Sequence, residues 1–320
     1  MKVYQNIFLK NYLWFKIGGK ASLVIDIPSK EDLIETLHFI KENKIQNIFV
    51  LGEGSNLLFR DELFDGAILH FTEPNPSSIK LVEDETIECF AGESLDSVIR
   101  FAFDNNLVGL EWAGGLPGTV GAAVRGNVGA FGGEIKDTFQ KAHGFRLLTD
   151  ENYEELSLDN SEMEFAYRTS RVKREKLIVV SSLFKLKKGD KEEVEKAKEV
   201  YYANINYRNE KHPLEYPNCG SVFKNISKPD EVEKVISVWP DIKSLVDTKW
   251  HGKVSMGYII DRLGLKGFRV GNAQVSEKHQ NFIINLGEAT SHDVKKIITT
   301  IEKKVQDTFG FTPEVEIEIV

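Results

Sequence analysis

The stretch that decides the fold is AGGLPGTVGAA, residues 113–123, which GNVGAFGG continues at residues 126–133. Glycine within a regular element costs roughly 0.5–1 kcal/mol relative to alanine, so a cluster this dense needs a compensating reason. One reason is close contact between the backbone and a bulky flat ligand or a pyrophosphate. The other is a crowded crossing of a helix over a sheet. The stretch alone leaves both explanations open.

A second, shorter glycine loop is GEGSN, residues 52–56, which follows an expected strand. The exposed N–H groups of such a loop can cradle phosphate oxygens, and Ser55 and Asn56 add side-chain hydrogen bonds. Taken alone, the loop is more typical of a tight turn. No GxGxxG opens a strand–turn–helix unit and no GxxxxGK[ST] occurs, so neither a Rossmann fingerprint nor a P-loop is indicated.

Composition limits the class of protein. A chain of 320 residues is long enough for two or three domains of ~100–200 residues each. The hydrophobic content of 41% and the 20 phenylalanines argue against global disorder. A net charge of −8 does not favour nucleic acid or anionic lipid as a partner.

Cysteine and histidine usage points to a reducing compartment and to no metal centre. The two cysteines, Cys89 and Cys219, exclude a disulfide scaffold. The seven histidines are scattered, without HExxH or a tight His/Cys/Asp cluster. No apolar run reaches the ~20 residues of a membrane span, and the N-terminus lacks a signal-peptide core. We therefore expect a cytoplasmic protein with no membrane partner.

Strand-like and helix-like segments alternate along the chain. Apolar periodicity predicts helices over residues 30–43, 95–105, 191–205, 255–263 and 291–308, with Ser29 and Ser94 as caps of the first two. Short apolar runs predict strands over residues 23–27, 48–51, 67–69, 86–91, 139–148, 177–186, 274–275, 282–285 and 315–319. The Lys/Glu-rich residues 185–198 predict a linker and a solvated helix face, so we place a domain boundary near residue 188.

Three further segments carry candidate chemistry: YRTSR at residues 167–171, NCGSVFKN at 218–225 and PEVEIEI at 313–319. Alone, the Tyr167-Arg168 pair is more typical of an arginine packed on a ring, and Ser221 is more typical of a turn. Glu314 begins the last expected strand and is the glutamate best placed to enter a cleft. Spacing and composition indicate a phosphate- or nucleotide-binding domain and a second domain with a serine-containing turn, without naming a reaction.

Seven segments in this order resemble the MurB family of bacterial peptidoglycan synthesis. They are KIGG (16–19), LGEGSNLL (51–58), GLEWAGGLPGTVGAAVRGNVGAFGGE (109–134), YRTS (167–170), GSVFKN (220–225), GLKGFRVGNAQVSEKHQNFIIN (264–285) and PEV (313–315). Any one of them is a weak signal, but seven in register are a strong one.

The resemblance implies an α+β fold with FAD bound noncovalently. The expected architecture is an FAD-binding fold of the vanillyl-alcohol-oxidase (PCMH) type in two lobes, residues 1–70 and 71–188, followed by a C-terminal α+β substrate-binding domain, residues 189–320. The implied reaction is the NADPH-dependent reduction of UDP-N-acetylglucosamine enolpyruvate to UDP-N-acetylmuramate. In it NADPH reduces the flavin, which then gives a hydride to the enolpyruvyl ether. The family serves cell-wall biogenesis, cell shape and cell division, and we expect a monomer.

The resemblance also implies catalytic roles for Arg168, Ser221 and Glu314. An enolate that forms on the substrate needs positive charge, which Arg168 supplies with a fork that matches a carboxylate. Ser221 is the expected proton donor to the substrate carbon, recharged by Lys224 or a water chain. Glu314 is expected to be buried, so that a raised pKa lets it carry a proton.

Binding residues follow from the same resemblance. The expected substrate contacts are Tyr167, Lys211, Lys224, Asn225 and His279. The expected cofactor contacts come from the two glycine loops and their surroundings: Gly52, Glu53, Gly54, Ser55, Asn56, Ala113, Gly114, Pro117, Gly118, Thr119, Gly121 and Asn127.

Three features depart from the family pattern. Trp14 stands where a small threonine-like residue is usual before the GG turn, and no long loop with a tyrosine lid is present, as in the shorter MurB subtype. Residues 226–252 form an added segment with Trp239 and Trp250, which we expect to pack on the body and not to line the substrate channel.

Two alternatives remain open at this point. One is another FAD-dependent oxidase or dehydrogenase of the same fold, acting on a small hydroxy compound. It would share the glycine loops but not GSVFKN with the terminal PEV. The other is a nucleotide-binding module that has lost its chemistry, against which the presence of Arg168, Ser221 and Glu314 argues.

Overall fold

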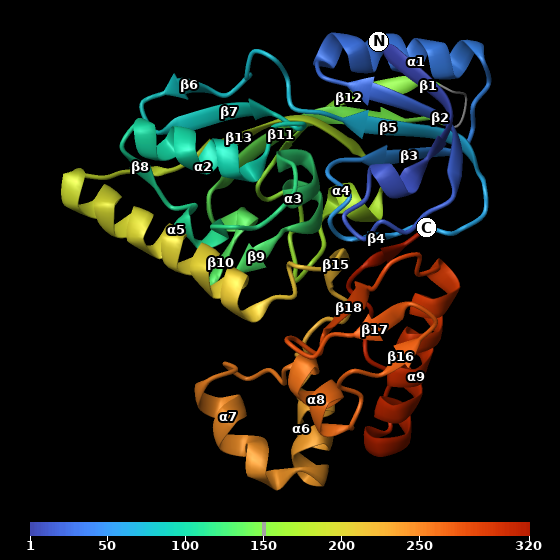
Figure 1. The fold of residues 1–320 in the computed structure, drawn as a ribbon. Coiled ribbons are helices and arrows are strands. Elements are labelled where there is room, and N and C mark those ends of the chain that lie inside the picture. Colours follow the sequence, from blue (N-terminus) through green and yellow to red (C-terminus); the bar gives the residue numbers. More distant parts are fainter. Residues whose placement is uncertain (149–151) are drawn as a thin grey trace. The chain divides into compact units, whose positions relative to one another are not determined.

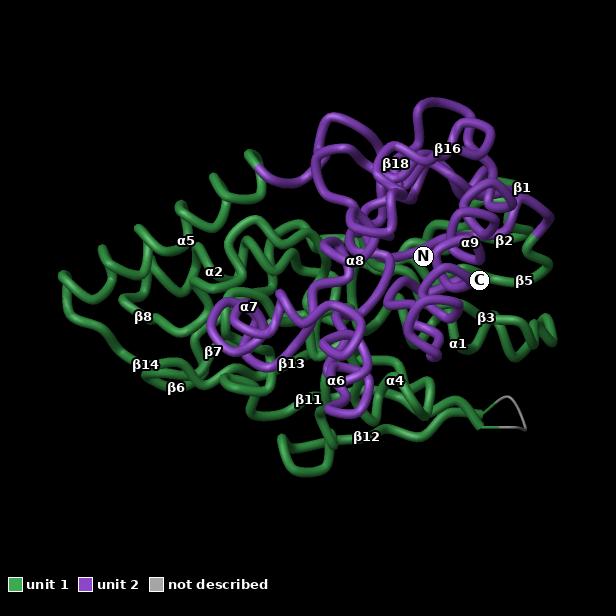
Figure 2. The backbone as a smooth tube through the Cα atoms, turned by 90° about the horizontal axis from the view of Figure 1, so that it is seen from below, with its two compact units in different colours: residues 1–7, 21–53, 64–210 green, residues 8–20, 54–63, 211–320 purple. Residues whose placement is uncertain are grey.

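The computed structural model describes residues 1–148 and 152–320. The chain forms two compact units, each assembled from distant segments (Figure 2). Unit 1 comprises residues 1–7, 21–53 and 64–210, and unit 2 comprises residues 8–20, 54–63 and 211–320. The three-part division at residues 70 and 188 stays a prediction.

The first sheet of unit 1 has the order β1-β2-β5-β3 (Figure 1). Its strands are β1 (Lys2–Phe8), β2 (Lys20–Ile27), β5 (Phe64–Phe71) and β3 (Ile48–Leu51), and β5 pairs in parallel with both β2 and β3. Helix α1 (Lys30–Glu42) contributes Leu33 and Leu37 to the core that also holds Ile25 of β2. Its predicted cap is confirmed, because the Ser29 hydroxyl accepts a bond from the Asp32 N–H at 3.1 Å.

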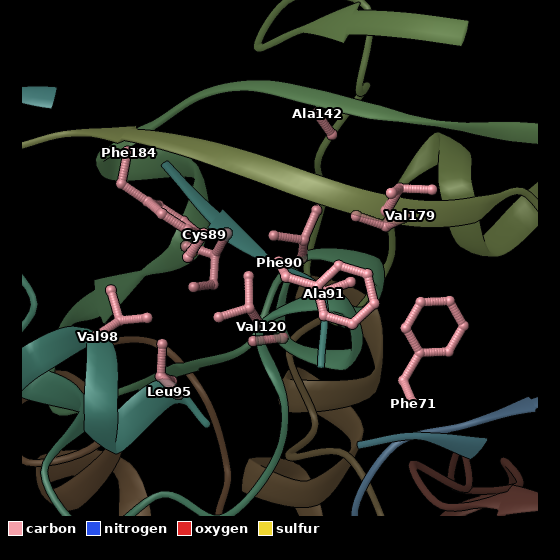
Figure 3. Close-up of a cluster of buried hydrophobic side chains, with 14 of the residues drawn as sticks. Phe71, Cys89, Phe90, Ala91, Leu95, Val98, Val120, Ala142, Val179 and Phe184 are labelled. Carbon is pink, nitrogen blue, oxygen red and sulfur yellow. The ribbon is translucent and has the colours of Figure 1, made fainter. Parts of the chain in front are cut away.

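The second sheet of unit 1 has the order β12-β11-β13-β7-β6 and its strands pair antiparallel. The strands are β12 (Tyr153–Asp159), β11 (Phe139–Leu147), β13 (Ile178–Lys185), β7 (Thr86–Phe90) and β6 (Lys80–Glu83). Helices α2 (Leu95–Asp104) and α3 (Val120–Gly126) add side chains to the same core. Figure 3 shows Leu95, Val98 and Val120 of these helices beside Cys89 and Phe184 of the sheet. The predicted Ser94 cap of α2 is confirmed.

Helix α5 (Lys191–Lys211) packs within unit 1 and is six residues longer than predicted at its C-terminal end. The Tyr201 hydroxyl donates to Asp96 of α2, and the Asn204 amide donates to the Glu111 carbonyl at 3.2 Å. The expected solvated face is confirmed, with exposed pairs such as Lys196–Glu192. Short elements complete unit 1: β8 (Leu107–Val108), η2 (Glu111–Ala113), β9 (Gly129–Ala130), β10 (Gly133–Glu134), η3 (Ile135–Asp137), α4 (Arg171–Arg174) and β14 (Lys187–Lys188).

Unit 2 is built on a sheet of order β15-β18-β17-β16. Its strands are β15 (Asn218–Ser221), β18 (Phe282–Asn285), β17 (Ala273–Val275) and β16 (Arg269–Val270), and its main helices are α8 (Met256–Arg262) and α9 (Ser291–Phe309). The N-terminal segment adds η1 (Leu9–Asn11), and β4 (Leu57–Leu58) pairs in parallel with β19 (Glu318–Ile319). The predicted strand over 315–319 is therefore shorter, and Val315 makes only an isolated bridge with Phe223.

The added segment of residues 226–252 folds into α6 (Pro229–Val238), η4 (Pro240–Ile242) and α7 (Lys243–Thr248). Its tryptophans pack on the body of unit 2, as predicted. The Trp239 ring meets Phe309 edge-on at 4.7 Å, and Trp250 lies 5.1 Å from Tyr258. The Arg262 guanidinium covers Trp239 at 4.5 Å from the ring centroid.

No helix in the part of the chain that the structure describes combines the length and the apolar character needed to cross a membrane.

Candidate active site

Two predicted cofactor loops meet within unit 1. The Gly118 N–H donates to the Glu53 carboxylate at 3.0 Å, and a Cβ added to Gly52 would lie 2.5 Å from the Thr119 hydroxyl oxygen. Only glycine at position 52 permits this approach. Thr119 also caps α3, since its hydroxyl accepts the Ala122 N–H at 3.4 Å. Gly52 and Glu53 therefore form one backbone-rich surface with the loop before α3.

The loop of residues 52–56 fits a phosphate-bearing cofactor. Among residues 1–148 and 152–320, no protein acceptor receives a hydrogen bond from the backbone N–H groups of this loop. Gly54 has a φ of +68°, the left-handed conformation that lets successive N–H groups converge on an anion. The Asn56 side chain is directed elsewhere, because its amide donates to the Glu316 carbonyl at 3.4 Å.

The glycine-rich stretch contains glycines in crowded packing and one with open space beside it. A Cβ on Gly114 would lie 2.3 Å from the Tyr201 carbonyl of α5, and one on Gly121 would lie 2.8 Å from the Ala91 Cβ, so these positions serve crowded packing. Gly126 has no heavy atom within 4 Å of its added Cβ among the described residues, so packing within the chain does not account for it.

Glu53 provides a pH-dependent test of this surface. Burial, and then the charges of Glu73 and Asp96, raise the pKa of the Glu53 carboxyl, although the Gly118 hydrogen bond opposes the shift. In the unfolded chain Glu53 has its ordinary pKa of 4.5, so it ionises there at a lower pH than in the folded protein. Between this value and the higher folded pKa, rising pH therefore lowers the free energy of unfolding. We expect Glu53→Gln to raise the Tm of the FAD-free protein at pH 7 by roughly 1–3 °C.

Thermal unfolding from acid to neutral pH checks this expectation. The Tm gain of Glu53→Gln should disappear below about pH 4, where Glu53 is protonated in both the folded and the unfolded chain. The control Glu83→Gln changes an exposed residue and should show no such trend. A lower Tm for Glu53→Gln at pH 7 would contradict the assigned effect of burial.

Arg168 occupies a tight turn in unit 1. Ala166 and Thr169 bond to each other through both N–H and carbonyl groups at 3.1 Å, which leaves Tyr167 and Arg168 as the turn residues. Arg168 has a φ of +60°, an uncommon and costly conformation for a residue with a side chain. Its Nη2 donates to the Gly129 carbonyl at 2.7 Å, and its guanidinium lies 4.9 Å from the Tyr167 ring centroid. The arginine is thus held in place by backbone and ring together.

Asn127 and Glu134 support this turn, which sequence reasoning did not detect. The buried Asn127 amide donates to Glu134 at 3.0 Å and to the Ala166 carbonyl at 3.1 Å, and its oxygen accepts the Lys136 N–H at 3.1 Å. These bonds use both amide hydrogens and one of the two lone pairs of the oxygen. A side-chain contact of Asn127 with a cofactor stays a prediction. Burial disfavours the ionised Glu134, but hydrogen bonds from Lys136 and Asn127 and the charge of Arg168 lower its pKa overall.

Ser221 lies at the end of β15 in unit 2. Gly220 before it has a φ of +79°, which requires glycine. The following residues are held by the buried Asn281, whose amide oxygen accepts the Phe223 N–H at 3.0 Å and whose amide nitrogen donates to the Phe223 carbonyl at 2.8 Å. The Asn281 carbonyl also accepts the Val222 N–H at 2.8 Å. No local pattern indicates this positioning role, because Asn281 lies 58 residues from Phe223.

The predicted burial of Glu314 is wrong. Its side chain is 61% exposed and forms an ion pair with Lys224, whose own side chain is 16% exposed. The Lys224 N–H also donates to the Glu314 carbonyl at 2.9 Å. The Glu314 backbone thus pairs with the GSVFKN segment, and its exposed carboxylate reaches Lys224. The structure thus brings Lys224 and Glu314 together in unit 2.

The remaining predicted substrate residues have different environments. The His279 ring packs against His212 at 5.5 Å and Phe282 at 4.7 Å, and burial lowers its pKa, so the imidazole is neutral at pH 7. Asn225 is exposed and its side-chain oxygen accepts the Met256 N–H at the start of α8, at 3.1 Å. Lys211 is exposed at the end of α5. Substrate contacts by these three residues stay predictions.

Comparisons with known proteins cover both units. Residues 212–320 match the family model described as the C-terminal domain of UDP-N-acetylenolpyruvoylglucosamine reductase, and residues 21–152 match an FAD binding domain. The chain is 39% identical to the UDP-N-acetylenolpyruvoylglucosamine reductase of Caldicellulosiruptor bescii over 98% of this chain and 88% of the relative. It is 40% identical to that of Caldicellulosiruptor saccharolyticus over 98% of this chain and 90% of the relative.

The fold also resembles a solved structure. The crystal structure of the reductase (MurB) from Thermus caldophilus aligns with a TM-score of 0.73 and 29% identity, covering 100% of this chain and 99% of that one. With the FAD binding domain match, this similarity confirms the expected fold class.

Proposed function

The chain belongs to the family of UDP-N-acetylenolpyruvoylglucosamine reductases, and from this premise we propose that it reduces UDP-N-acetylglucosamine enolpyruvate to UDP-N-acetylmuramate with NADPH. The product, UDP-N-acetylmuramate, is used in peptidoglycan synthesis. The observation that carries the proposal is 39% identity over 98% of the chain. The motif residues Arg168, Ser221 and Glu314 are all present in that span.

FAD, when bound, would supply the hydride transfer from NADPH to the enolpyruvyl substrate. The protein contributes the surface that holds it. We assign the diphosphate to the free N–H groups of residues 52–56. The Gly52–Thr119 contact keeps Gly52 against the start of α3. Contacts of the other predicted cofactor residues belong to the same proposal.

The substrate needs a cation and a proton. Reduction places negative charge on the carbon next to the carboxylate, and Arg168, preset by its turn and by the Gly129 carbonyl, supplies a fixed guanidinium for it. Ser221 donates the proton to that carbon. Its position after Gly220, with the next residues held by Asn281, limits its movement.

Lys224 and Glu314 act as a pair in this proposal. Because Glu314 is exposed and ion-paired, we assign it to orienting Lys224, and Lys224 to returning a proton towards Ser221. Tyr167, Lys211, Asn225 and His279 complete the proposed substrate contacts. We further propose that the enzyme is a monomer in the reducing cytoplasm. Its two FAD-binding lobes would span residues 1–70 and 71–188, and its substrate-binding domain residues 189–320.

The test is NADPH oxidation by the purified, yellow holoenzyme with and without UDP-N-acetylglucosamine enolpyruvate. We expect oxidation to be strongly stimulated by this substrate and not by small hydroxy acids. Stimulation by a hydroxy compound alone would support the alternative FAD enzyme. A colourless protein that FAD cannot reconstitute would rule out both enzymes.

A further inference from the structure

Arg208 of α5 is a buried cation without an acidic partner. Its residue exposure is 9%, and no carboxylate of the described residues forms an ion pair with it. Its Nε donates to the Gly114 carbonyl at 3.0 Å, while its two Nη groups donate to no acceptor in residues 1–148 and 152–320. A guanidinium carries five N–H donors in a planar fork, so most of this fork is unused by the protein.

Burying such a charge is costly, and the Gly114 carbonyl and the Phe131 ring offset only part of this cost. Burial lowers the pKa of Arg208 to about 10, so the group stays charged at neutral pH. An unpaired buried charge destabilises the folded chain. Charges kept at such a cost are characteristic of ligand sites, where the ligand provides the missing partner.

The aromatic wall beside Arg208 is also held in an unfavourable conformation. Phe131 and Gly132 form the tip of the β9–β10 hairpin with φ values of 50° and 90°, as in a type I′ turn. Such turns favour Asn, Asp or Gly, not phenylalanine. Phe131 is 49% exposed, and its ring lies 5.2 Å from the Arg208 guanidinium carbon. Tyr207 supports it edge-on at 5.4 Å.

We propose that Arg208 binds a diphosphate oxygen of a nucleotide ligand through its free Nη groups, with Gly114 and Phe131 holding the guanidinium in place. A planar fork suits this group because it can donate two parallel hydrogen bonds to neighbouring oxygens. Arg208 is anchored on the glycine-rich stretch matched by the FAD binding domain, which favours FAD over the UDP-sugar as the source of the diphosphate. The inference rests on the proposed function only in naming FAD and the UDP-sugar as the two candidate ligands.

Three variants test the proposal in the full-length chain. Arg208→Met removes the charge and keeps an apolar stem, Arg208→Lys keeps the charge and loses the fork, and Lys196→Gln removes an exposed charge from the same helix. The affinity for FAD is measured on FAD-free protein by fluorescence, and that for UDP-N-acetylglucosamine on holoenzyme by calorimetry. The Tm of each ligand-free protein is measured alongside.

We expect Arg208→Met to weaken FAD binding by about 10- to 100-fold, the loss of one charge-assisted contact. Arg208→Lys should recover part of the affinity, and Lys196→Gln should match the wild type. The Tm of ligand-free Arg208→Met should be unchanged or higher, because an uncompensated charge is removed. A purely structural arginine would instead lower the Tm and leave affinity intact.

The outcomes separate the possible sources of the diphosphate. If Arg208→Met weakens the binding of UDP-N-acetylglucosamine but not of FAD, Arg208 binds a diphosphate and its source is the UDP-sugar. If both affinities of Arg208→Met stay within twofold of the wild type, the inference is overturned. If the wild type binds neither ligand, the proposed function fails. Titration with inorganic diphosphate then tests Arg208 itself, since equal binding by wild type and Arg208→Met overturns the inference and tighter wild-type binding supports it.

Discussion

Ser221→Ala is expected to leave flavin reduction by NADPH at the wild-type rate and to slow flavin reoxidation by the enolpyruvyl substrate by about 10²- to 10⁴-fold. This range is the usual contribution of a positioned general acid. The fold should be unaffected, because the left-handed turn is at Gly220 and the Asn281 bonds are to the backbone of residues 222 and 223. Alanine therefore removes the hydroxyl and little else.

Stopped-flow absorbance of the flavin separates the two halves of the reaction. Ser237→Ala, an exposed serine in α6, is the matched control and should behave as the wild type in both halves. Reoxidation of Ser221→Ala at the wild-type rate would remove Ser221 from the mechanism. Slower reduction by NADPH would mean that the change acts on the first half-reaction instead.

Asn281→Ala is expected to destabilise unit 2 by about 3 kcal/mol. The substitution leaves the buried N–H and carbonyl of Phe223 without their partners, and each unsatisfied buried group costs about 1–3 kcal/mol. It also frees the segment after Ser221, so kcat should fall with stability. Asn281→Asp keeps the acceptor for the Phe223 N–H and loses the donor, so we expect an intermediate loss.

Urea unfolding followed by tryptophan fluorescence measures this effect. Three of the four tryptophans, Trp14, Trp239 and Trp250, belong to unit 2, so the signal reports mainly on that unit. The neighbouring Gln280→Ala is the control, since its amide bonds only locally to the Glu277 carbonyl at 2.9 Å. A loss below about 1 kcal/mol for Asn281→Ala would show that water or a shifted backbone satisfies the Phe223 groups.

Local chemistry made several elements predictable. Ser29 and Ser94 precede apolar residues at helical spacing, and both cap their helices in the structure. The strand over 48–51 was predicted to the residue. Helix α6 was missed although Pro229 opens it and Val232, Val235 and Ile236 recur at helical spacing, so the local signal was present. Helix α7 has only six residues, too few for a periodic pattern to indicate a helix.

The functional residues divide in the same way. Gly52, Gly118 and Thr119 were predicted from two motifs, and the structure brings them together. Glu314 was expected to be buried because a proton-carrying glutamate needs burial. Glu314 lies 90 residues from Lys224, and the pairing of the two backbone segments brings its exposed carboxylate to this lysine. No local pattern encodes such a pairing.

By itself the sequence determined helices such as α1 and α2, the glycine loops and the family, because these depend on residue types at short spacing. Only the tertiary structure decided which glycines pack against α5, which asparagine holds the Ser221 segment and which arginine is buried without an acid. Such roles arise from contacts between residues far apart in the chain. Burial, desolvation and the satisfaction of backbone groups are properties of those contacts, and no local pattern encodes them.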